Sequence, residues 1–134
     1  VINASSMVAH KANFSGANLN SANLGAARLV SANLDGTDCF DINLVGADLS
    51  HASLKKAKFP RARLGLTNFY EAQMSGASLA TAIAREASFQ RADLKGVDFN
   101  GAILQRAMFW GAKVEREDVN KAANLDGVQF QEDL

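Results

Sequence analysis

Large apolar residues recur at every fifth position of this chain, from Phe14 to Val114, without a slip of register. These 21 positions hold 11 Leu and 6 Phe, with one Cys, one Met, one Ala and one Val. Two residues before each of them stands a small residue, which is Ala in 17 of the 21 units, and the position between the two is Asn or Asp in 10 units. The chain is therefore an internal repeat of five residues, and its fold has to bury two positions of every unit.

Neither a regular helix nor a continuous strand can bury a pattern with this period. A helix turns by about 100° per residue, so the apolar position would move around it by about 140° with each unit. A strand alternates its faces, so an odd period would flip the apolar position at every repeat. The inward spacing instead fits a short extended segment followed by a corner. Four corners of about 90° would close a coil of about 20 residues, and successive coils would stack about 4.8 Å apart.

Motifs such as ANLNS, ANLGA, ADLSH and ADLKG resemble the A(D/N)LXX units of pentapeptide-repeat proteins. The resemblance covers residues 12–116 in unbroken register. It implies an all-β solenoid, a right-handed quadrilateral parallel β-helix with Leu, Phe and Ala pointing inward. The 21 units would make about five coils, and stacking alone would give a rod about 25 Å long.

Both ends depart from the pattern that residues 12–116 follow. Residues 1–11 keep the register with Ala4 and Ala9 but lack the large side chain, so we expect a frayed or degenerate N-terminal coil that leaves this end uncapped. Residues 117–134 change character, with acidic Glu117 early and basic Lys121 later, which is typical of a short helix. Since an open parallel edge invites pairing, we expect this helix to cap the C-terminal end.

Composition narrows the function classes. The 14 basic and 14 acidic residues balance, which argues against a basic nucleic-acid binder and against a strongly acidic mimic of one. No stretch approaches the ~18 apolar residues of a membrane span. The chain begins at Val without a signal-like segment, so we expect a processed or excised chain. The cytoplasm is the favoured location, with the thylakoid lumen or periplasm as alternatives if a targeting segment has been removed.

Candidate chemistry is sparse. His10 and His51 fall at outward positions without Cys or carboxylate partners at metal-ligand spacing. Asp38 and Asp41 do not make a general acid and base pair, because the repeat already favours Asp at the first. The single cysteine, Cys39, excludes an internal disulfide framework and takes an inward position, so it is expected to be a core residue. We expect no catalytic, cofactor or metal site, and no enzyme.

A basic band is the first unusual surface feature. It comprises five cations within nine residues, Lys55, Lys56, Lys58, Arg61 and Arg63. Such a band could contact an acidic partner or a phosphate backbone. The favoured interpretation is a solvated band that acids in neighbouring coils balance. No aromatic residues are interleaved for base stacking, so direct nucleic-acid binding is not expected.

Apolar residues at outward positions are the second feature. Ile83 and Ile103 are 20 apart and should stack on one face, while Tyr70 and Trp110 share a column on the adjacent face. An apolar strip with Tyr and Trp is typical of an interface, although scattered exposed apolar residues are also ordinary. The candidate partner surface is Leu66, Tyr70, Ile83, Ile103, Met108 and Trp110.

The leading functional prediction is a non-enzymatic repeat scaffold that mediates protein–protein interaction through its outer faces. Its partner is unknown, and a homodimer through the uncapped end or the apolar edge is an alternative arrangement. The resemblance implies a second function, modulation of DNA gyrase by an acidic rod that imitates DNA and confers quinolone resistance. This chain departs from that type, because it is neutral and carries a basic band. A third alternative is a structural or lumenal protein of cyanobacterial or plastid type.

Overall fold

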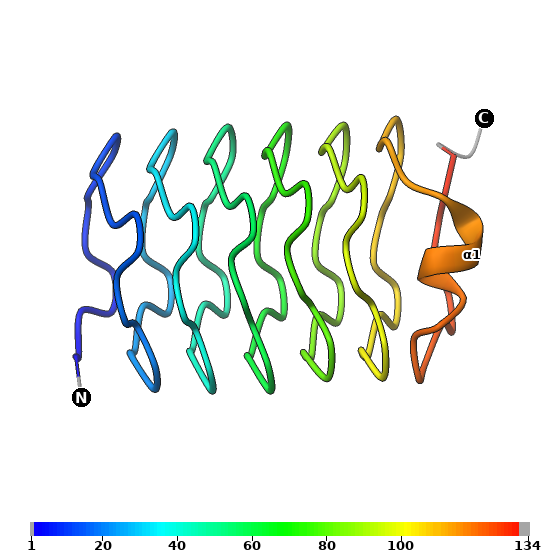
Figure 1. Cartoon of the computed structure of the whole chain (residues 1–134), viewed down its shortest axis with the longest axis horizontal. Coiled ribbons are helices and arrows are strands. Elements are labelled where there is room, and N and C mark those ends of the chain that lie inside the picture. Colours follow the sequence, from blue (N-terminus) through cyan, green and yellow to red (C-terminus); the bar gives the residue numbers. More distant parts are fainter. Residues whose placement is uncertain (1, 132–134) are drawn as a thin grey trace.

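The computed structural model describes residues 2–131 and shows a rod of stacked coils with the two chain ends at opposite ends of the rod (Figure 1). Parallel β-bridges join residues 20 apart, from Asn3 and Asn23 to Asp93 and Lys113. Each five-residue unit contributes one bridged residue and a two-residue turn, so the described residues form isolated bridges instead of extended strands. Four units therefore make one coil, and the chain is a quadrilateral β-helix solenoid, as the period predicts.

The repeat explains its own Asn and Asp preference. In nine of the ten units that carry Asn or Asp before the large residue, that side chain accepts a hydrogen bond from the N–H two residues later. This N–H belongs to the first turn residue, and Asn and Asp are suited to binding it. Asp38 is the exception, because the N–H of Phe40 donates instead to Oδ1 of Asn20, at 2.8 Å.

The core consists of the inward columns. The large residue of each unit and the residue two positions before it, usually Ala, are buried from Leu19 to Phe109. The Phe side chains of one column stack along the rod axis, with ring centroids 5.1 Å apart for Phe69 and Phe89 and 5.0 Å apart for Phe89 and Phe109. Phe130 continues the stack at 5.4 Å from Phe109. This interior is apolar and continuous, so it gives the outer faces a rigid support.

The first coil is built from the degenerate units. Asn3 and Val8 are bridged to Asn23 and Arg28 in the next coil. Ala4 and Ala9 stand where later units have the large residue, and both are only half-buried against the core. Residues 2–11 therefore keep the coil geometry with a thinner core, and Val1 lies outside the described residues.

The C-terminal end holds α1, a single turn of helix at Arg116–Val119, which lies across the end of the rod (Figure 1). Among the described residues it is the only helix, and four residues are too few to cross a bilayer. After α1 the chain returns to the solenoid, where Asn124 pairs with Ile103 and Gln129 with Met108. The expected cap and tail thus contain a short helix and two further bridged units, while residues 132–134 lie outside the described part.

Four faces follow from this register, and the two turn residues after each face form the corner to the next. The bridged columns run at every twentieth residue from Asn3 to Ile103 on face 1, from Val8 to Met108 on face 2, from Asn13 to Lys113 on face 3 and from Asn18 to Asp98 on face 4.

Candidate interaction surfaces

The structure places the predicted partner surface on two faces and two corners. Ile83 and Ile103 are adjacent in the column of face 1, and Leu66 lies at the corner between faces 1 and 2. Leu66 is 60% exposed and Ile83 is 36% exposed, whereas Ile103 is half-buried. Val45, one coil before Leu66 at the same corner, is 40% exposed and was missed by sequence reasoning. These four residues form what we call the Leu66 patch.

The other three predicted residues are half-buried. Met108 belongs to face 2, where its Sδ accepts a hydrogen bond from Nε2 of Gln90 at 3.6 Å. Tyr70 and Trp110 lie at the corner between faces 2 and 3, and the indole N–H of Trp110 is buried without a hydrogen-bond partner in the described part of the chain. Tyr70 and Trp110 are therefore separated from the Leu66 patch by the width of face 2, and Met108 lies between them and the patch.

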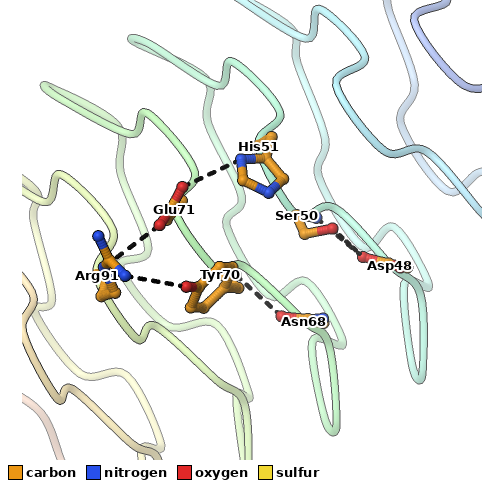
Figure 2. A network of polar contacts seen from close by, with 7 residues as sticks. All are labelled: Asp48, Ser50, His51, Asn68, Tyr70, Glu71 and Arg91. Carbon is orange, nitrogen blue, oxygen red and sulfur yellow. Dashed lines mark hydrogen bonds and ion pairs between the residues drawn. The ribbon is translucent and has the colours of Figure 1, made fainter.

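Tyr70 belongs to a polar network that runs along its corner across three coils (Figure 2). Glu71 lies 3.3 Å from Nδ1 of His51 and 3.3 Å from Nε of Arg91. Arg91 also donates to the Tyr70 hydroxyl at 3.2 Å, and the ring of His51 meets that of Tyr70 edge-on, with centroids 5.8 Å apart. The network holds the Tyr70 ring in place and pairs the charges of this corner with one another.

A shallow polar groove of about 500 Å³ lies beside this network. It contains Glu71 and Arg91 together with Gln73, Asp93 and Lys113 of face 3. Both signs of charge line it, and Glu71 is already paired within the network. In the described part of the chain, no group of three or more His, Cys, Asp or Glu side chains could hold a metal ion.

The basic band covers about half of the perimeter of one coil. Its members occupy the corner between faces 3 and 4, face 4 itself, the next corner and face 1, and all are exposed: Lys55, Lys56, Lys58, Arg61 and Arg63. The preceding coil carries an acidic band 20 residues earlier, formed by Asp35, Asp38 and Asp41. Each Asp therefore lies beside a cation in the same column, and the two bands carry opposite charge along the same side of the rod.

The repeat also identifies the family. The family model described as pentapeptide repeats matches residues 10–50, 47–83 and 85–116, with eight copies. These segments cover most of the chain and coincide with the bridged coils. The chain belongs to the pentapeptide-repeat family. Pentapeptide-repeat proteins form right-handed quadrilateral β-helices and are generally non-enzymatic scaffolds.

Several solved pentapeptide-repeat structures are similar to this chain. HetL, involved in heterocyst differentiation regulation in the cyanobacterium Nostoc, is 26% identical over 97% of this chain and 73% of its own, with a TM-score of 0.47. A thylakoid-lumen protein of Arabidopsis thaliana is 23% identical over 85% and 72%, with a TM-score of 0.48. The plasmid-mediated fluoroquinolone resistance protein QnrB1 is 12% identical over 96% and 93%, at 0.34. All three TM-scores are below 0.5, and no curated protein sequence matches significantly.

Cys39 takes an inward position of the pentapeptide repeat and is fully buried. Burial raises the pKa of its thiol to about 11, and the charge of Asp38 adds to this, while the contact with Thr37 lowers it. The Sγ atom lies 3.4 Å from Oγ1 of Thr37. A buried, protonated thiol is a poor nucleophile, so Cys39 is a core residue.

We expect Cys39 to react with thiol reagents at pH 8 at least about 100-fold more slowly in the folded protein than in the unfolded chain, because the higher pKa reduces the thiolate fraction by that factor. The raised pKa also means that the folded state binds this proton more tightly. The resulting stability is present below pH 9 and is lost as the pH rises towards 11. Labelling rates with and without urea check this, and equal rates would contradict the burial of Cys39.

Proposed function

We propose that this protein is a non-enzymatic scaffold that binds another protein through the Leu66 patch. One observation carries the proposal. Leu66 is 60% exposed and has a φ of 57°, in the left-handed region. The exposed Leu66 side chain gains none of the free energy that burial would give it. The left-handed backbone conformation costs a residue with a side chain about 1–2 kcal/mol. The second turn residue has a positive φ in every unit of the repeat, but elsewhere it is Gly, Ala or a polar residue, so a large apolar residue there is best explained by a contact with a partner.

The surroundings of Leu66 fit such a contact. Gly65 precedes Leu66 in the chain and Gly46 is its neighbour in the preceding coil, so no side chain shields it on that side, while Glu86 is its neighbour in the following coil. Val45 and Ile83 extend the apolar surface to the adjacent coils. The partner is expected to insert an apolar residue beside Leu66 and to cover face 1, because interface cores are apolar and well packed.

Leu66→Gly separates binding from folding. The change relieves left-handed strain of about 1–2 kcal/mol and adds a glycine entropy cost of about 0.5–1 kcal/mol, so stability should be unchanged or rise by up to about 1.5 kcal/mol. A photo-crosslinking residue at position 86, the next position in the column, should capture a discrete protein in cells of the source organism. Leu66→Gly should abolish that adduct without lowering the melting temperature.

The matched control carries the same photo-crosslinking residue at Ser31, an exposed turn position at the corner between faces 2 and 3. The same adduct from both positions, or an adduct that survives Leu66→Gly, would contradict the proposal. Gyrase modulation is separable in the same preparation. Inhibition of supercoiling by the purified protein at micromolar concentration, undiminished by Leu66→Gly, would favour that function over binding through the Leu66 patch.

We infer that α1 closes the C-terminal end of the solenoid core, so that the interaction takes place on the sides of the rod. Val119 is fully buried and follows Phe99 by one coil length. The guanidinium of Arg116 lies over the ring of Phe130, 3.7 Å from its centroid, which covers the end of the Phe stack. A covered end cannot add another coil by edge pairing.

A further inference from the structure

We propose that face 4 binds a second copy of this chain in antiparallel orientation, with the acidic band of each copy against the basic band of the other. This self-association uses a different side of the rod from the Leu66 patch and does not depend on the function proposed above.

The two bands share one register. Asp38 and Lys58 are bridged to each other in the column of face 4, so their side chains occupy the same lateral position in adjacent coils. Asp35 and Lys55 have this relation at the corner with face 3, and Asp41 and Arg61 have it at the corner with face 1, since each pair is 20 residues apart. Three acids therefore form a row across the face, and three cations form a second row one coil further.

Four of the six charges in these rows are exposed, and no ion pair of the described residues joins the two rows. The exposed charges are Lys55, Lys58, Arg61 and Asp38. Asp35 and Asp41 are half-buried, and Oδ1 of Asp35 accepts hydrogen bonds from the Ser53 hydroxyl and the Lys55 N–H, which leaves its other oxygen for a partner. Asp38 is also the carboxylate that does not bind its own turn, because Asn20 takes the N–H of Phe40 in its place.

Symmetry then selects one dimer geometry. Two rods in face-to-face contact are related by a two-fold axis in the plane of the interface. If that axis runs along the rod, acid meets acid and cation meets cation. If it runs across the rod, between the two rows, Asp38 meets Lys58 of the other copy and the two corner pairs match in the same way. The antiparallel dimer thus places three complementary contacts on each side of its axis.

The neighbouring coils allow close approach. On this face the coil before the acidic row and the coil after the basic row carry small neutral residues, which face each other across the antiparallel interface. These residues are Ser15, Gly16, Asn18, Asn20 and Ser21 in one coil and Ser75, Gly76, Ser78, Ala80 and Thr81 in the other. Neither coil adds a bulky or charged side chain that would hold the faces apart.

Phe40 supplies an apolar contact near the axis. Its side chain is 42% exposed, and Pro60 follows it by one coil at the same corner. In the antiparallel dimer Phe40 of each copy meets Pro60 of the other. The guanidinium of Arg61 lies 5.8 Å from the Phe40 ring centroid, so the ring already borders the basic row. Sequence reasoning missed Phe40, although it is the one aromatic residue in its column.

The size of the overlap predicts a weak dimer. The matched part of the face spans four coils, about 20 Å along the rod at a coil spacing of ~4.8 Å. A contact of this length is expected to bury less area than a standard stable interface, which buries ~800 Å² per partner. Since its contacts are mostly ionic and exposed, the dimer should form at micromolar to millimolar concentration and weaken with salt.

Sedimentation velocity of the full chain tests the proposal, at about 0.02 M and about 0.5 M salt, where the screening lengths differ several-fold. We expect dimer at low salt and monomer at high salt. Asp38→Lys and Lys58→Asp should each weaken the dimer at least tenfold, because each places like charges in contact twice. An equimolar mixture of the two variants should form a heterodimer, and the double variant Asp38→Lys/Lys58→Asp should regain the homodimer.

Asp126→Lys is the matched control, with the same change of charge at the exposed corner between faces 1 and 2, and it should leave the dimer unchanged. Thermal melts check that every variant is folded. A parent protein that stays monomeric at low salt up to millimolar concentration would overturn the proposal, and so would a dimer that Asp38→Lys leaves intact. A heterodimer without recovery in the double variant would also overturn it, because that result indicates parallel rods.

Discussion

Leu64→Asp is expected to unfold the protein or to split the solenoid near its middle. Leu64 is fully buried, and its neighbours along the column of face 1, Leu44 and Ala84, offer a carboxylate no hydrogen bond from their side chains. A buried carboxylate without a partner costs several kcal/mol, which is comparable with the whole stability of a small domain, about 5–15 kcal/mol. Because each coil contacts only its neighbours, the damage would separate the coils on the two sides.

Arg63→Asp is the matched control, since it introduces the same side chain one residue earlier at an exposed position of face 1. We expect it to change the free energy of unfolding by no more than about 0.5 kcal/mol, and the conservative Leu64→Met by less than about 1.5 kcal/mol. Thermal melts followed by circular dichroism give the loss of structure, and hydrogen exchange shows which coils remain protected. A melting temperature unchanged by Leu64→Asp would be incompatible with the burial of this column.

The backbone of this protein was predictable because every unit has to bury the same two positions. Leu64, Cys39 and Ala84 differ in size, yet all three take the inward position that the five-residue count assigns and all are buried. The period also predicted the corner positions, since the chain has to turn wherever the spacing between successive inward residues increases from two to three. The coil length of 20 residues follows from four such corners and agrees with the bridges.

The C-terminal end was less predictable because the repeat resumes out of phase. Ala123-Asn124-Leu125 has the repeat motif, but α1 adds one residue, and Asn124 pairs with Ile103 at a spacing of 21. A search confined to the five-residue count passes over these units and assigns them to a cap and tail. The motif itself was the signal that would have found them.

The contacts and exposure of outward side chains were the hardest features to predict, because the repeat determines the backbone position of each residue but not the direction in which its side chain extends. Tyr70 shares its column with exposed positions, yet Arg91 and His51 hold its ring in the corner network. Val45 and Phe40 are more exposed than Tyr70, although their positions in the repeat are equivalent. The acidic row can be read from the sequence. Its position beside the basic band depends on the coil length of 20 residues, which places Asp38 and Lys58 in one column.

Phe89→Ala is expected to lower the free energy of unfolding by about 3–5 kcal/mol, the usual cost of removing a buried Phe side chain. Phe89 is fully buried and lies between two stacked rings, at 5.1 Å from Phe69 with an interplanar angle of 4° and at 5.0 Å from Phe109 with an angle of 14°. Such aromatic pairs contribute about 0.5–1.5 kcal/mol each beyond the apolar area that they bury. Removal of the middle ring breaks both pairs and leaves a cavity inside the coil.

Phe59 provides the comparison that isolates the stacking energy. It is fully buried in the column of face 4 between Cys39 and Leu79, and it has no stacked aromatic partner in the described part of the chain. Phe59→Leu and Phe89→Leu remove the same atoms, and Leu is the usual residue at this position of the repeat. We expect Phe89→Leu to cost about 1–3 kcal/mol more in urea-unfolding experiments, because it alone breaks two aromatic pairs. Equal costs would show that the Phe column stabilises the rod by burial alone.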